Sequence, residues 1–150
     1  ILVAFSSASS AAALSSNLQS VQRLGASRPV SSFLIPLGNT INMDGTAIYM
    51  GVCSIFAATF FGIDLTFDKQ ILIVIIAMLA SVGTMGVPGA GVIMISMVFT
   101  QVGIPLEAIA LIAGIDRVLD MMRTTLNVLG DATGALTVSK AENDMHPIQE

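Results

Sequence analysis

The chain has 150 residues, of which 54% are hydrophobic and 11% are charged, and its formal net charge is −4. Soluble domains carry about 25% charged residues, so this composition excludes an ordinary soluble protein. The sequence has no cluster of Lys and Arg to form a nucleic-acid-binding surface, and its single cysteine, Cys53, excludes an internal disulfide or a cysteine-based zinc site.

Three long stretches, residues 1–22, 45–63 and 70–106, contain no charged residue. The last is longer than the ~20 residues that a helix needs to cross a bilayer. We therefore predict an all-α membrane protein that lies in a lipid bilayer. The first residues are hydrophobic but lack the basic flank of a signal peptide, so we expect a fragment whose N-terminal part is missing.

Residues 1–27 begin with an apolar segment and continue into a run of serine and other small residues, residues 6–17. Small residues allow close backbone approach, and serine hydroxyls can bond backbone groups where a helix breaks. We interpret this region as a re-entrant helical hairpin with the serine-rich run at its tip. A soluble flexible linker is the alternative.

Residues 30–62 are long enough to span a bilayer, but polar residues and two glycines interrupt them at residues 38–46. A discontinuous transmembrane helix gains from such an interruption, because its unwound carbonyls and helix ends can bind ions and polar ligand groups. Asp44 would be unfavourable by several kcal/mol in a span if it were unpaired. The alternative is an Asx-turn in a soluble protein.

Residues 68–103 contain two apolar arms, residues 71–80 and 92–102, around a glycine-rich segment at residues 81–91. Apolar stretches of 10–14 residues favour re-entrant segments over full spans. The pattern predicts a second re-entrant hairpin, with a tip whose glycines allow conformational change. Two transmembrane helices joined by a surface loop are the alternative.

Residues 105–139 are predicted to form the last transmembrane helix, and residues 141–150 form a polar tail that we expect to be disordered. Polar residues in this helix recur at spacings of three and four, which places them on one amphipathic stripe. They are Asp116, Asp120, Arg123, Thr124, Asn127 and Asp131. Ionisable groups facing the inside of a membrane bundle indicate a functional site.

Three motifs carry a resemblance to a known family: Asn42-Met-Asp-Gly-Thr46, Gly86-Val-Pro-Gly-Ala-Gly91 and the stripe from Asp120 to Asp131. Their order and separation resemble those of the sodium-coupled dicarboxylate and amino-acid symporters, the excitatory glutamate transporter family. The resemblance covers residues 1–140 and implies the C-terminal part of a mobile transport domain. It also implies a multi-pass protein of the cell (inner) membrane, and a homotrimer formed through a scaffold domain that this fragment lacks.

The resemblance implies a role for each matching residue in binding an acidic amino acid or dicarboxylate. Arg123 would pair with the side-chain carboxylate of the substrate, and Asp120 would bind its ammonium group. Thr124 and Asn127 would hold the α-carboxylate and neighbouring polar atoms. Further substrate contacts would come from Ser10, Thr46, Val87 and Gly91.

The resemblance also implies sodium ions as co-transported partners. One sodium site would use Gly38, Asn42, Asn127 and Asp131. A second would use Thr40, Met43, Ser81, Val82 and Thr84, mostly through carbonyls. Asn42 and Asp44 would form part of a third.

The chain departs from the family pattern at the two places where members carry an extra arginine, which are Ala8 and Met121 here. Arg117 lies one turn before Met121 and would take over that charge, although it points away from the stripe. Asp116 is either a structural partner of Arg117 or a ligand, and the sequence leaves both readings open.

The function that this implies is sodium-coupled symport of aspartate or glutamate by alternating access, with the second hairpin as the gate. The alternatives are a proton- or sodium-coupled symporter of C4-dicarboxylates or neutral amino acids, and, in another class, an ion channel. An enzyme is not expected, because no Ser/His pair, HExxH motif or cysteine pair occurs and the single histidine, His146, lies in the tail.

Overall fold

The computed structural model describes residues 1–84 and 86–145, and most of them are helical. The elements in chain order are α1 Leu2–Ser7, α2 Ser10–Arg23, α3 Arg28–Ile41, α4 Asp44–Phe60, α5 Phe67–Val82, α6 Ala90–Val102, α7 Ala108–Ala113 and α8 Asp116–Ala141. No strand forms among the described residues, where Ala26 and Met145 make an isolated bridge. The prediction of a helical chain is confirmed for this part of the protein.

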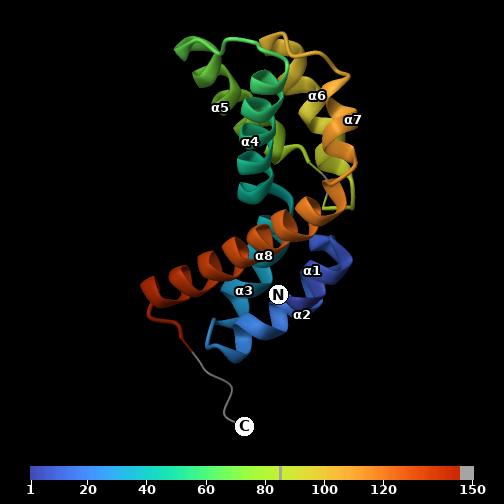
Figure 1. The fold of residues 1–150 in the computed structure, drawn as a ribbon. Coiled ribbons are helices and arrows are strands. Elements are labelled where there is room, and N and C mark those ends of the chain that lie inside the picture. The colour runs from blue at the N-terminus through green and yellow to red at the C-terminus, as the bar shows by residue number, and fades with distance from the viewer. Residues whose placement is uncertain (85, 146–150) are drawn as a thin grey trace.

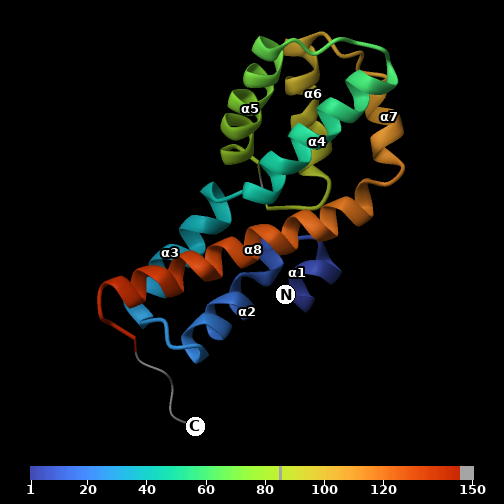
Figure 2. The same cartoon turned by 60° about the vertical axis from the view of Figure 1, so that its left-hand side comes forward.

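Helix α8 crosses the molecule and contacts α1, α2, α3 and α4 (Figures 1 and 2). Helices α1, α2 and α3 lie along one part of α8, and α4 to α7 form a second group at its N-terminal end. The polar stripe of α8 therefore lies where these two groups meet.

Helices α1 and α2 form a bend at Ala8 and Ser9. Ala8 adopts a left-handed conformation with φ 50°, and the Ser9 side chain accepts a hydrogen bond from the Ala12 amide at 3.2 Å as the N-cap of α2. The bend is shorter than the predicted serine-rich tip, because the serines that follow Ser9 continue as α2. Local propensity did not predict this, since a run of serine and alanine is compatible with either state.

Helices α3 and α4 are separated at Asn42 and Met43, whose backbone angles are not helical. Together they make the one helical stretch of the described residues that is long and apolar enough to cross a membrane, Arg28–Phe60. Pro36 lies inside α3 and Asp44 begins α4, where an acidic group suits the helix N-terminus.

Helices α5 and α6 run side by side and pack against α4. Their shared core contains Met50 of α4, Ile73 and Ala77 of α5, and Ile95 and Phe99 of α6. Large apolar side chains on the other faces of α4 and α5 are exposed, as a lipid environment requires.

The predicted single helix over residues 105–139 is wrong, because Gly114 and Ile115 divide it into α7 and α8. The new N-terminus gains Asp116 in its first turn, which complements the helix dipole. The start of the tail also differs from the predicted disorder, since the Asp144 amide donates to the Ser139 carbonyl at 2.9 Å. Residues 146–150, with His146, lie outside the described residues.

Candidate functional site

The polar stripe of α8 is buried along its whole length. Each of its six members is at most 7% exposed: Asp116, Asp120, Arg123, Thr124, Asn127 and Asp131. They are spaced so that one helix face carries them all, and this face meets α3 and α4. Burying so many polar groups requires a partner for each of them.

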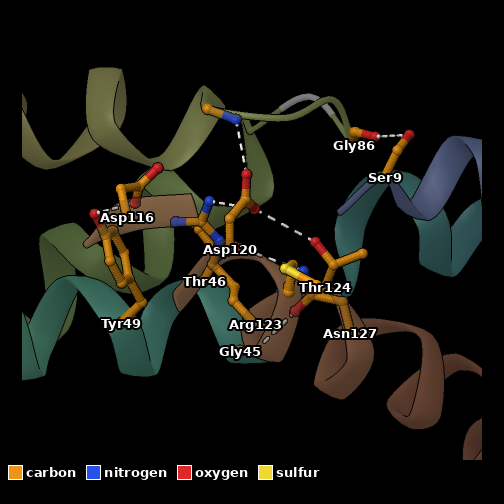
Figure 3. A network of polar contacts seen from close by, with 12 residues as sticks. Ser9, Gly45, Thr46, Tyr49, Gly86, Asp116, Asp120, Arg123, Thr124 and Asn127 are labelled. Carbon is orange, nitrogen blue, oxygen red and sulfur yellow. Dashed lines mark hydrogen bonds and ion pairs between the residues drawn. The ribbon is translucent and has the colours of Figure 1, made fainter. Parts of the chain in front are cut away.

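Asp120 and Arg123 form an ion pair with 2.5 Å between Asp120 Oδ1 and an Arg123 guanidinium nitrogen. The other carboxylate oxygen of Asp120 accepts a hydrogen bond of 2.8 Å from the Gly89 amide, in the segment between α5 and α6. The Thr124 hydroxyl lies 3.4 Å from Asp120 Oδ1. Asp120 therefore connects α8 to the glycine-rich segment (Figure 3).

Tyr49 of α4 contacts the Arg123 guanidinium through its aromatic ring. Its ring centroid lies 4.4 Å from Arg123 Cζ, and its hydroxyl donates to Asp116 Oδ1 at 2.8 Å. The second terminal nitrogen of Arg123, Nη1, is buried and has no hydrogen-bond partner. The guanidinium also packs directly against Gly91, where a Cβ would overlap it. The Arg123 guanidinium therefore has an unused hydrogen-bond donor for an anionic ligand.

Asn127 forms hydrogen bonds to the residues where α4 begins, after the interruption between α3 and α4. Its Oδ1 accepts from the Gly45 amide at 2.8 Å, and its Nδ2 lies 3.1 Å from the Met43 sulfur and 3.3 Å from Thr46 Oγ1. Gly45 packs so closely on α8 that a Cβ would lie 2.5 Å from the Arg123 carbonyl oxygen. The contact fixes the start of α4 against the stripe.

These elements enclose a cavity of about 10 Å³. The structure brings all eight residues predicted to contact the substrate to its wall: Ser10, Thr46, Val87, Gly91, Asp120, Arg123, Thr124 and Asn127. Met43, Thr84, Gly86 and Ala90 complete the lining.

Three of the residues predicted for the first sodium site, Gly38, Asn42 and Asp131, contact one another. Asn42 Nδ2 donates to Asp131 Oδ1 at 3.0 Å, and a Cβ on Gly38 would lie 2.8 Å from Asp131 Cγ. Asn127 is one turn earlier on α8, but its amide is engaged by α4. Asp44 is exposed and approaches the backbone of Gly130.

The hydroxyls predicted for the second sodium site each bond to their own helix. The Thr40 hydroxyl donates to the Pro36 carbonyl at 3.3 Å, that of Ser81 to Met78 at 2.8 Å and that of Thr84 to Ala80 at 3.0 Å. Val82, whose carbonyl was predicted as a ligand, has an exposed side chain. Within residues 1–84 and 86–145, no three His, Cys, Asp or Glu side chains gather as a metal site. The five residues predicted for the second site include no carboxylate, so a cation there would depend on carbonyl and hydroxyl oxygens.

Sequence reasoning missed Tyr49, the hydrogen-bond partner of Asp116. Asp116 bonds to Tyr49, whereas Arg117 is exposed and so does not replace the family's extra arginine inside the site. One signal was available. Tyr49 is the only tyrosine of the chain and lies three residues after Thr46, which places the two on one helix face.

The profile of the sodium:dicarboxylate symporter family matches residues 1–141 of the chain. The chain belongs to this family. It is 40% identical over 143 residues to the proton/glutamate-aspartate symporter of Escherichia coli (strain K12), which covers 95% of the chain and 33% of that protein.

Two other relatives have similar coverage. The proton/sodium-glutamate symport protein of Bacillus subtilis (strain 168) is 38% identical over 98% of this chain and 34% of its own length. The excitatory amino acid transporter of Caenorhabditis elegans is 43% identical over 97% of this chain and 30% of its own length. The chain thus spans about a third of the length of these relatives.

Proposed function

We propose that the protein is a secondary transporter that carries an acidic amino acid, aspartate or glutamate, across the cell membrane together with sodium. The observation that carries this proposal is the buried ion pair of Arg123 and Asp120 at the wall of the cavity. Membership of a symporter family supports the activity, and the names of the relatives support the substrate class.

The ion pair favours a ligand that carries both an anion and an ammonium group. Such a ligand separates the pair by giving Arg123 a carboxylate and Asp120 a cation, so each buried charge keeps a partner. Arginine suits this role because its planar guanidinium binds a carboxylate through two parallel hydrogen bonds. The unpaired Nη1 of Arg123 supplies one of those donors.

A C4-dicarboxylate without an ammonium group fits the site less well. It satisfies Arg123 but leaves the Asp120 carboxylate facing a second anion in a poorly screened site. A neutral amino acid satisfies Asp120 through its ammonium group, but it has no side-chain carboxylate to pair with Arg123. The ion pair thus ranks an acidic amino acid first and these two classes below it.

The charges around the site explain why a cation would accompany the substrate. The buried side chains Asp116, Asp120, Asp131 and Arg123 sum to −2 when all are ionised, so an acidic substrate meets net repulsion. A sodium ion near Asp131 reverses part of that charge, and hard oxygen ligands such as the Asp131 carboxylate suit a hard cation. Sodium then raises the affinity for the substrate, and the substrate raises the affinity for sodium by the same factor.

The arrangement in the membrane follows from the same proposal. Residues 1–27 and 68–103 form re-entrant hairpins, residues 30–62 the broken transmembrane helix, and residues 105–139 the last transmembrane segment with the break found at Gly114. Together residues 1–140 make the C-terminal part of a transport domain whose second hairpin gates the site. A scaffold domain outside this chain assembles the trimer.

Uptake of labelled aspartate into proteoliposomes tests the proposal. The full-length transporter that contains this chain is reconstituted and given an inward sodium gradient, a proton gradient, both or neither. We expect concentrative uptake with the sodium gradient alone. Uptake driven only by the proton gradient would refute sodium coupling, and no uptake or counterflow under any condition would refute the transport of aspartate.

A further inference from the structure

Hydrogen bonds hold the segment Gly86–Gly91 at two points, one from Gly89 to Asp120 and two to the Gly86 carbonyl. The Gly89 amide donates to Asp120 at 2.8 Å within the candidate site. The Gly86 carbonyl accepts from the Ser9 hydroxyl at 2.8 Å and from the Ala11 amide at 3.4 Å. A ligand ammonium group that binds Asp120 competes with the bond from Gly89 and does not compete with the two bonds to the Gly86 carbonyl.

Ser9 is held in the correct orientation for this contact. Its Oγ accepts from the Ala12 amide at 3.2 Å as the N-cap of α2, and it donates its only proton to Gly86 (Figure 3). The same atom therefore fixes the start of α2 and joins it to a segment 77 residues away. The lining of the cavity includes Ser10 but not Ser9, so Ser9 acts from outside the site.

The junction around Gly86 leaves no room for a side chain. A Cβ on Gly86 would overlap the Ser10 hydroxyl and would lie 3.4 Å from the Ala11 amide nitrogen and 3.6 Å from Asn39 Oδ1. Asn39 Oδ1 is itself buried without a hydrogen-bond partner. The backbone of Gly86 therefore packs directly on Ser10 and α3.

We propose that the bond from Ser9 to Gly86 anchors the segment Gly86–Gly91 while the second hairpin is closed, and that a bound ligand does not compete for it. It keeps this segment over Arg123 when a ligand ammonium group takes Asp120 from Gly89. Ser9 is thus a positioning residue, which sets ligand affinity without touching the ligand. The part of this inference that concerns the ligand rests on the proposed function.

The test combines amide hydrogen exchange with aspartate binding in the full-length transporter, using four variants. Ser9→Ala removes both the cap and the anchor. Ser9→Asp keeps a good cap but has no proton to donate to Gly86. Ser9→Thr keeps both functions, and Ser20→Ala is the matched control, because the exposed Ser20 hydroxyl bonds only to the Ser16 carbonyl of its own helix.

We expect Ser9→Ala and Ser9→Asp to weaken aspartate binding about fivefold, since a net hydrogen bond is worth ~1 kcal/mol. In both variants the Ala11 and Gly89 amides exchange faster, and with bound aspartate the increase is largest at Gly89. Ser9→Thr and Ser20→Ala behave as the wild type does.

If Ser9→Asp had the same aspartate affinity and the same exchange rates as the wild type, the anchor would be overturned. The N-cap alone would then explain the effect of Ser9→Ala. Faster exchange without any change in affinity would overturn the positioning role. If the wild type bound no acidic amino acid, the proposed function would fail, yet exchange at Ala11 and Gly89 in Ser9→Ala would still decide whether the anchor exists.

Discussion

Asp120 accepts hydrogen bonds from three groups, the guanidinium of Arg123, the hydroxyl of Thr124 and the amide of Gly89. It is 3% exposed, so these donors replace the water that a surface carboxylate would have. Its charge balances that of Arg123, and the proposed preference for an acidic amino acid depends on that balance.

We predict that Asp120→Asn lowers aspartate affinity by about 100-fold, as expected when one member of a buried charge pair is removed. The same change removes the negative charge that opposes a dicarboxylate, so succinate should compete better against labelled aspartate in the variant than in the wild type. Asp64→Asn is the matched control, since Asp64 is exposed in the connection between α4 and α5. Unaltered aspartate affinity in Asp120→Asn would contradict the role assigned to this carboxylate.

At the scale of single residues, the spacing of polar groups in α8 predicted which face is buried. Spacing along one helix cannot reveal a partner on another helix, and this is why the two readings of Asp116, a partner of Arg117 or a ligand, did not include its bond to Tyr49. The sequence also could not predict that the Asp44 side chain is exposed. Asp44 lies in an apolar stretch of the sequence, but it is exposed in the fold of this chain.

Among the helices, α3 and α8 approach each other through glycines. Gly38 of α3 packs on the Asp131 side chain, and Gly130 of α8 packs on Asn42 and Asp44. Small residues allow helices in membranes to come this close. Close approach brings the Asp131 carboxylate to Asn42 and to the end of α3, where the first sodium site is proposed.

We predict that Gly38→Ala lowers the free energy of unfolding by ~1–3 kcal/mol and weakens sodium-dependent aspartate binding, because its methyl group would overlap Asp131. Gly134→Ala is the matched control on the facing helix, since a Cβ there meets no atom within 4 Å. It should be neutral or slightly stabilising. Thermal unfolding followed by circular dichroism and sodium titrations of binding measure both effects, and equal behaviour of the two variants would refute the packing argument.

At the scale of elements, glycine and polar interruptions predicted the separation of α3 from α4 and the segment between α5 and α6. The division of α7 from α8 was missed, although Gly114 before an acidic residue is a boundary signal. The serine-rich run was assigned wholly to a tip because composition alone does not say where a bend occurs. Tertiary contacts at Ser9 decide that position.

In the whole molecule, the residues that line the cavity come from α2, α4, α6 and α8, from Met43 between α3 and α4, and from the segment between α5 and α6. No local pattern brings such distant segments together. Composition and periodicity predicted a membrane protein with a polar stripe, but the set of residues around the cavity was predicted from the resemblance to a family.

A whole-molecule consequence is the linkage between cation and substrate. We predict that raising sodium lowers the aspartate dissociation constant, and that raising aspartate lowers the sodium dissociation constant by the same factor. Binding titrations of the full-length transporter in sodium and in choline, at equal ionic strength, measure this factor. Equal aspartate affinity in the two salts would contradict a cation site that acts by reversing charge.

The central claim is that Arg123 selects the acidic side chain of the substrate, and uptake by Arg123→Cys tests it most directly. Labelled aspartate and labelled serine are offered in parallel to proteoliposomes with wild type or variant. The account predicts that the variant loses aspartate uptake and retains or gains serine uptake, because Asp120 can still hold the ammonium group of either. Aspartate uptake that survives at the wild-type rate would contradict the account.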